Sequence, residues 1–267
     1  MFCKVINHDQ QNLDSYLTLK REIQLARKIQ RKLLNGEKPI LINSQVSGFS
    51  IPASMIGGDY FDFYPLSDGK VRIIIGDVMG KGIPAAMLMI LTRGAFRSAA
   101  EVTEGPGETL TSMNKAIFKD LRTLSSFVTV FCADWDPNTG SLVYANAGHY
   151  MPVLVRGNTE TFELPDLKGV MLGGLPDQVY QEKEIRLLEG DTLFFYTDGI
   201  VEAQNCHGEM FQIERLHETL MQNAHKTASE LETIVIDTLT NFTEGLPQKD
   251  DITMVILKVG TGKDQQR

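Results

Sequence analysis

Four separate segments of this chain place an aspartate at the end of a hydrophobic run, next to a glycine or a second aspartate. They are Asp59 in "GGDYFD", Asp77 in "IIIGDVMGKG", Asp198 in "LFFYTDG" and Asp250-Asp251 in "KDDITMVI". Each one alone is ordinary turn or helix-cap sequence. Together they indicate a cation site, because ionised carboxylates in apolar surroundings are disfavoured and repel one another. Oxygen ligands suit Mg²⁺ or Mn²⁺.

The chemistry that such a site supports best is hydrolysis of a phosphoester. Two metal ions about 3.5–4 Å apart can bridge one water, lower its pKa and aim it at phosphorus. The segment "GDVMGKG" lacks the GxxxxGK[ST] spacing of a nucleotide-binding loop. Zinc is disfavoured because no His or Cys has ligand spacing near the aspartates. His149 in "NAGH" is the nearest candidate, and a lone histidine after a strand is more often structural.

The elements that must position these aspartates alternate between runs of strands and pairs of helices. Strands are expected at residues 49–54, 59–66, 70–79, 127–136, 141–148, 151–156, 161–165, 191–199 and 250–259, with "SDG" as a hairpin turn. Helices are expected at residues 15–34, 84–100, 108–123, 211–222 and 228–242. This order favours an α+β fold with antiparallel sheets covered by helices.

Composition excludes several classes of function. The net charge of −8 argues against a nucleic-acid or anionic-membrane surface. The three cysteines are scattered without a disulfide or zinc spacing, which favours a reducing cytoplasm. The longest apolar run, at residues 83–91, is too short to span a bilayer, and the N-terminus does not read as a signal peptide. The run at 83–91 is expected to be core packing.

The helix at residues 15–34 carries an apolar stripe opposite a basic face. Asp14 or Ser15 can cap its start, and Gly36 stands at its stop position. The stripe comprises Leu19, Ile23, Ala26, Ile29 and Leu33. Packing on its own domain and pairing with a second copy as a short coiled coil both remain open. The expected domains are a helical extension or linker at 1–36, a catalytic domain at 37–260 and a disordered tail at 261–267.

Five blocks together resemble the metal-dependent protein phosphatase (PPM) family, in its bacterial SpoIIE/RsbU-like serine phosphatase branch. They are "MIGGDYFDFYPL", "GDVMGKGIPAAMLM", "NAGHYMPVLV", "FYTDGIVEA" and "KDDITMVIL", in the family order. The resemblance extends over residues 22–259. It implies an αββα sandwich of two mainly antiparallel sheets flanked by helices, with a pair of Mn²⁺ or Mg²⁺ ions at one edge.

The resemblance also implies a role for individual residues. Asp59 and Asp77 would be metal ligands, with Asp77 bridging both ions, and the backbone carbonyl of Val78 would be a further ligand. Asp198 and Asp250 would hold the first ion from the other side; Asp250 is preferred over Asp251 because the aspartate that opens this motif is the ligand in relatives. Asp62 would lie behind the ligands or be a surface aspartate at a strand end.

Two positions depart from the pattern of eukaryotic relatives. The histidine expected two residues after the bridging aspartate is Met79 here, and the phosphate-binding arginine expected five residues before Asp59 is Ser54. Bacterial members commonly share both departures. The proton donor to the leaving group is therefore unassigned, and Lys81 is either a helper in phosphate binding or an exposed loop lysine.

The implied activity is a protein serine/threonine phosphatase that hydrolyses phosphoserine or phosphothreonine on a regulatory protein. By analogy with this branch, the substrate would be a STAS-type anti-sigma-factor antagonist. A homodimer or an activating partner would act through the helix at 15–34. A catalytically silent binding module of the same fold and a metal-dependent phosphodiesterase or nucleotide hydrolase are the alternatives.

Overall fold

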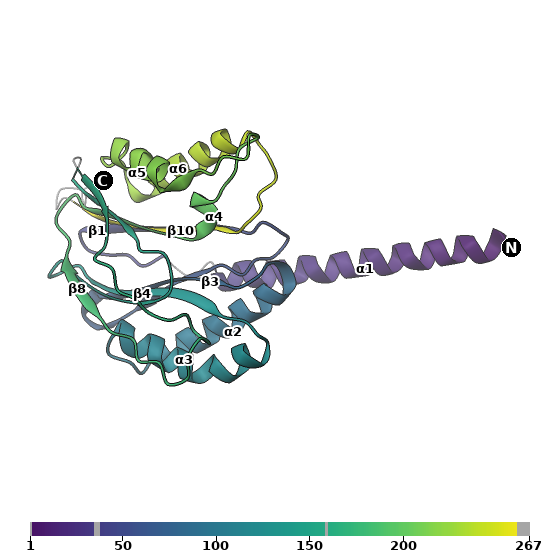
Figure 1. The fold of residues 1–267 in the computed structure, drawn as a ribbon, viewed down its shortest axis with the longest axis horizontal. Coiled ribbons are helices and arrows are strands. Elements are labelled where there is room, and N and C mark those ends of the chain that lie inside the picture. The colour runs from purple at the N-terminus through teal and green to yellow at the C-terminus, as the bar shows by residue number, and fades with distance from the viewer. Residues whose placement is uncertain (1, 35–37, 158–159, 261–267) are drawn as a thin grey trace.

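The computed structural model describes residues 2–34, 38–157 and 160–260, which form four layers plus one projecting helix. Two β-sheets pack face to face, and helices cover the outer face of each (Figure 1). This is the αββα sandwich expected from the sequence. Within the described ranges, no helix is both long and apolar enough to cross a membrane.

Each sheet has five strands, and all the named strand pairs are antiparallel. The first sheet has the order β1 (Ser44–Ile51), β10 (Ile252–Val259), β9 (Thr192–Tyr196), β6 (Val153–Arg156) and β7 (Glu160–Glu163). The second has the order β2 (Tyr60–Pro65), β3 (Val71–Val78), β4 (Val128–Asp136), β5 (Ser141–Ala147) and β8 (Lys183–Arg186). Residues far apart in sequence therefore become neighbours, as where β1 pairs with β10.

Helices cover the two sheets in separate groups. The second sheet carries α2 (Gly82–Ala100) and α3 (Pro106–Thr123), and the first carries α4 (Asp198–Val201), α5 (Gln212–Gln222) and α6 (Ala228–Thr243) (Figure 1). The β2–β3 turn contains a short 3₁₀ helix, Ser67–Gly69, in which Asp68 has φ 59°. Aspartate tolerates this left-handed backbone, which is why "SDG" closes the hairpin.

The period-two alternation of strand side chains sorts the apolar residues among three core layers. On β3, Ile73 and Ile75 pack between the sheets, whereas Ile74 packs under α2 and α3. On β10, Val255 packs between the sheets and Met254 packs under the helices on the other side. Both central strands are thus buried on both faces, so they appear in the sequence as continuous apolar runs.

The expected elements are confirmed, with differences at three places in the sandwich and one in the N-terminal helix. β8 was missed because its sequence "KEIR" is polar and mostly exposed on the sheet edge. The short helix α4 was missed because "DGIV" has no helical pattern of its own. β1 begins at Ser44, earlier than expected, because "SQVSG" has no clear alternation of apolar and polar residues.

The N-terminal helix α1 is longer than expected and projects away from the sandwich. It runs from Phe2 to Leu34 (Figure 1), so the cap expected at Asp14 or Ser15 is wrong. The stretch before Gly36 contains no glycine or proline to stop a helix. Of the apolar stripe, Leu19 and Ile29 are more than half exposed. From residue 14 on, where the side chains of α1 are described, the hydrogen bonds to the sandwich come from Gln30 and Leu33 in its last turns. The tail at 261–267 lies outside the described residues.

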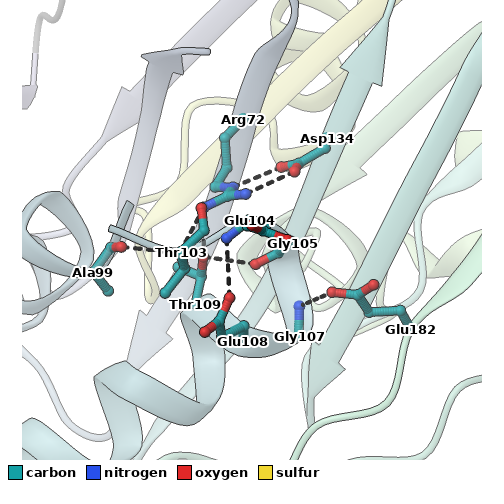
Figure 2. Close-up of polar contacts among 10 residues, drawn as sticks. All are labelled: Arg72, Ala99, Thr103, Glu104, Gly105, Gly107, Glu108, Thr109, Asp134 and Glu182. Carbon is teal, nitrogen blue, oxygen red and sulfur yellow. Dashed lines mark hydrogen bonds and ion pairs between the residues drawn. The ribbon is translucent and has the colours of Figure 1, made fainter. Parts of the chain in front are cut away.

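A buried polar cluster around Arg72 on β3 connects the end of α2 and the start of α3 to the second sheet (Figure 2). Arg72 is completely buried and donates to both carboxylate oxygens of Asp134, at 2.6 and 2.7 Å. Its remaining terminal nitrogen donates to the hydroxyls of Thr103 and Thr109, at 2.9 and 2.6 Å. Glu182 accepts from the backbone of Gly107 in the first turn of α3. The bonds satisfy the guanidinium, so the cluster is structural.

Candidate active site

The four predicted aspartates lie at the same edge of the sandwich, although they come from four segments. Asp77 lies on β3 with the parity of Ile73 and Ile75, so the strand directs it between the sheets, where β3 ends. Asp198 begins α4, directly after β9, and Asp250 precedes β10. Asp59 precedes β2. The negative charges of Asp198 and Asp250 act on Asp77, and that of Asp77 acts on Asp59.

The electrostatics of this edge are those of an uncompensated acidic cluster. Burial and the charges of Asp198 and Asp250 raise the pKa of Asp77 to about 7. Burial and the charge of Asp250 likewise raise the pKa of Asp198 to about 6. Aspartates with pKa values this high lack a cationic partner strong enough to offset desolvation and mutual repulsion. A bound cation would supply it.

Asp59 is the most deeply buried of the four. Burial and the charge of Asp77 raise its pKa well above the ordinary value, while hydrogen bonds from Thr253 and Thr197 act in the opposite direction. The Thr197 hydroxyl donates to Asp59 Oδ2 at 2.7 Å. Sequence reasoning missed Thr197, although it directly precedes Asp198 in "YTDG". It couples the start of β2 to the end of β9, and thereby one sheet to the other.

The adjacent aspartates at the start of β10 have different tasks. Asp251 is buried, and its carboxylate accepts from the backbone N–H groups of Ala53 and Gly58, both at 2.7 Å. These bonds shape the loop before Asp59. Asp250 is half-buried, and one of its oxygens pairs with Lys81 Nζ at 2.6 Å. Asp250 is therefore the one of the pair whose carboxylate is available to an exchangeable cation.

Two motif glycines are required by the close approach of Asp251. A Cβ at Gly57 would lie 2.3 Å from Asp251 Oδ2, and one at Gly199 would lie 1.9 Å from the Asp251 backbone oxygen. Neither gap accommodates a side chain. The Gly57 backbone is also held from α1, because the buried Gln30 amide donates to its carbonyl at 2.7 Å and accepts from its N–H at 3.3 Å. Nothing in the local sequence pattern distinguishes Gln30.

The donor set fits hard divalent cations. It consists of the carboxylates of Asp59, Asp77, Asp198 and Asp250, with the Val78 carbonyl one peptide unit beyond Asp77. Such all-oxygen sets suit Mg²⁺ or Mn²⁺ rather than zinc. In the described part of the chain, no group of three or more His, Cys, Asp or Glu side chains is already arranged to hold a metal ion. Mg²⁺ is usually bound by only one or two carboxylates and keeps several waters.

Three other residues singled out by the sequence are placed as follows. Asp62 is buried rather than a surface aspartate; it accepts from Tyr60 Oη and Arg97 Nε, both at 2.7 Å, and so fixes α2 to β2. His149 is buried and structural, as expected: Nε2 donates to the Tyr196 carbonyl at 3.0 Å, and Nδ1 accepts from a threonine hydroxyl. Burial lowers the pKa of His149 to about 4.

The two positions that depart from the eukaryotic pattern are both at the surface. Met79 is 50 % exposed, and Ser54 is also exposed. Lys81 is exposed as well, and its ammonium group contacts Asp250 and the Lys249 carbonyl. In this structure, the Lys81 ammonium group therefore lies next to the aspartate cluster. It contacts a carboxylate oxygen of Asp250, a residue that is predicted to bind metal.

Solved structures with this architecture place the fold among the PP2C-type phosphatases. The SiaA-PP2C domain of Pseudomonas aeruginosa superposes with a TM-score of 0.80 at 24 % identity, over 91 % of this chain and 98 % of that one. The RsbU and RsbW domains of Rv1364c from Mycobacterium tuberculosis give a TM-score of 0.72 at 22 % identity, over 84 % and 62 %. At these identities, the likeness establishes the fold.

Sequence comparison narrows the class to a family. The chain is 29 % identical to the phosphoserine phosphatase RsbU of Bacillus subtilis, over 90 % of this chain and 70 % of RsbU. It is 30 % identical to the protein IcfG of Synechocystis, over 88 % of this chain and 41 % of IcfG. The family described as Stage II sporulation protein E (SpoIIE) matches residues 67–260. The chain belongs to this family and is a PP2C-type protein serine/threonine phosphatase.

Proposed function

We propose that this protein hydrolyses phosphoserine or phosphothreonine on a regulatory protein, with a water held between two Mn²⁺ or Mg²⁺ ions as the nucleophile. The observation that carries this proposal is the convergence of four aspartates on one edge, where burial and the neighbouring carboxylates raise the pKa values of Asp59, Asp77 and Asp198. When bound, the ions would lower the pKa of the shared water and neutralise the phosphate.

The residues of the chain have distinct tasks in this proposal. Asp77, whose carboxylate interacts with those of Asp59, Asp198 and Asp250, would be the ligand shared by both ions. The hydroxyl of Thr197 fixes one oxygen of Asp59. Lys81 must leave Asp250 when a metal ion binds there, and its ammonium group is then within reach of the phosphate.

We propose a phosphorylated STAS-type anti-sigma-factor antagonist as the substrate. Support comes from the relatives: RsbU and RsbP of Bacillus subtilis are phosphoserine phosphatases, and one solved neighbour joins RsbU and RsbW domains. Another neighbour is described as part of the bacterial stressosome. A cytoplasmic location is part of the same proposal.

One assay tests the activity and its alternatives. The protein is incubated with Mn²⁺ and, separately, a phosphoserine protein, a chromogenic monoester and a cyclic nucleotide, and wild type is compared with Asp198→Asn. Manganese-dependent monoester hydrolysis that the variant lacks supports the proposal. Binding of the phosphoprotein without turnover supports a silent binding module instead, and cleavage of the cyclic nucleotide supports a phosphodiesterase.

We further propose that residues 1–36 form a regulatory extension of a catalytic domain at 37–260, and that a second copy or an activator acts on α1. Two contacts of α1 support this proposal: Gln30 holds the loop before Asp59, and the Leu33 carbonyl accepts from Arg93 on α2 at 3.1 Å. Ile23→Asp combined with Ile29→Asp tests it. Unchanged oligomeric state and unchanged phosphatase rate would contradict it.

A further inference from the structure

An apolar groove begins at the end of β3 and follows α2 toward the end of α3. Its volume is about 680 Å³, and its apolar lining comprises Met79, Pro84, Met87, Leu88, Leu91 and Leu124. Met87 is 70 % exposed and Leu124 is 60 % exposed. Figure 1 shows the two helices side by side on the outer face of the second sheet. Among the described residues that line the groove, Asp120 alone carries a charge.

The outward face of α2 is apolar although its inward face already supplies the core. Ala85, Ala86 and Met89 are buried against the second sheet, as expected for core packing. Ile83 and Met87 point the other way and are exposed. A surface helix normally carries polar residues on that side. Adjoining exposed apolar side chains of this kind mark an interaction site.

We propose that this groove binds the substrate chain next to its phosphorylated serine or threonine, and that it selects an aliphatic, uncharged stretch. The inference rests on the proposed function. It is carried by continuity with the aspartate site: Met79, at one end of the groove, is two residues from Asp77, so their Cα atoms are at most about 7 Å apart. A protein that places a phosphoryl group at the aspartates therefore comes close to this end of the groove.

The length of the groove defines the peptide that it fits. Along α2, Pro84 and Leu91 are seven residues apart, or about 10 Å of helix. Three residues of extended chain span about the same distance. The side chains that enter the groove are therefore two to four residues from the phosphorylated residue, and Leu, Ile, Met or Val match the lining.

Charge further restricts the occupant. Asp120 lines the groove, so acidic residues of the substrate would be repelled there. A second copy of this chain seated permanently on the groove would cover Met79 and obstruct protein access to the aspartates. A transient substrate contact avoids that obstruction.

Synthetic phosphoserine peptides test the proposal. One set carries a single leucine at each position from four residues before to four residues after the phosphoserine in a Ser/Gly background, and a parallel set carries glutamate. For wild type with Mn²⁺, we expect kcat/KM to be about tenfold higher for the best leucine peptide than for the background peptide. Met87→Asp and Leu124→Asp should remove this preference through KM, with kcat little changed.

Val102→Asp is the matched control, because Val102 is 76 % exposed but follows the far end of α2. It should retain the leucine preference, and all three variants should hydrolyse p-nitrophenyl phosphate at the wild-type rate. Equal kcat/KM for leucine and background peptides in wild type would overturn the groove assignment, as would a preference that survives Met87→Asp. If Met87→Asp changes the sedimentation coefficient, and so the oligomeric state, without changing the peptide preference, the groove would be assigned to a second copy of the chain instead. Failure of the proposed phosphatase function would be distinguishable from failure of the groove assignment, because wild type would then not hydrolyse p-nitrophenyl phosphate at all.

Discussion

Replacing Asp77 by asparagine should stabilise the metal-free protein while abolishing its phosphatase activity. The carboxylate lies at the centre of the acidic cluster, and its pKa in the folded chain is raised to about 7 from an ordinary value of 3.8. Asparagine has nearly the same shape and cannot ionise. It therefore removes the repulsion on Asp59 and Asp198 without leaving a cavity, and it also removes the ligand proposed to be shared by two ions.

The direction of the pH dependence follows from proton binding. Between pH 4 and pH 7, the unfolded chain has released the Asp77 proton whereas the folded chain retains it, so wild-type stability falls as pH rises. The full stability contribution of the protonated group is present below about pH 4 and is lost above pH 7. Because one pKa unit corresponds to about 1.4 kcal/mol, the loss at this group is about 2 kcal/mol at pH 5 and about 4 kcal/mol at pH 8.

Urea unfolding in the presence of a chelator, followed by circular dichroism at pH 5 and pH 8, measures the effect. Asp77→Asn should be more stable than wild type, with a margin that grows with pH toward the values above. Saturating Mn²⁺ should stabilise wild type much more than the variant, by about 2.7 kcal/mol at one hundred times the dissociation constant. Asp237→Asn, which removes an exposed carboxylate on α6, is the control and should show no such margin. A variant less stable than wild type at pH 8, or a margin independent of pH, would refute the reasoning.

Three further predictions concern residues around the site and the core. Asp250→Asn should weaken Mn²⁺ binding, measured by calorimetry, with little effect on unfolding. Asp251→Asn should destabilise the fold by about 1–3 kcal/mol, because the amide has a single acceptor oxygen and one of the two loop N–H groups loses its partner; the opposite pattern would exchange their roles. Arg72→Met should lower the free energy of unfolding by about 3–5 kcal/mol, and adding Asp134→Leu should recover much of this loss, since the second change removes the unpaired buried carboxylate; a double variant no more stable than the single one would contradict this reading. Gln30→Ala should lower Mn²⁺ affinity and phosphatase rate with a small change in melting temperature, because Gln30 holds the loop before Asp59; an unaltered Mn²⁺ titration would count against it.

Much of the fold and of the candidate site could be predicted because the relevant signals are local. Alternation of apolar residues marks the strands, and helical spacing marks α2, α3, α5 and α6. The parity of Asp77 relative to Ile73 and Ile75 already places its carboxylate on the face between the sheets. Polar edge strands such as β8 could not be predicted from the sequence, because a strand without a buried face has no alternation of apolar and polar residues.

Other properties required the tertiary structure because they depend on partners distant in sequence. The family resemblance favours Asp250 over Asp251 as a ligand, but the residue types themselves do not distinguish the two. The structural difference is that Asp251 accepts hydrogen bonds from a loop about 190 residues earlier. The sequence left open whether Asp62 lies behind the ligands or at the surface, and the structure buries it in contact with Arg97. The apolar run at 83–91 reads as core, yet the structure buries one side of it and exposes Met87. The local periodicity of the sequence thus specifies which face of a strand or helix a side chain occupies. Packing between distant segments decides what that face contacts, and whether a carboxylate is hydrogen-bonded or available to bind a cation.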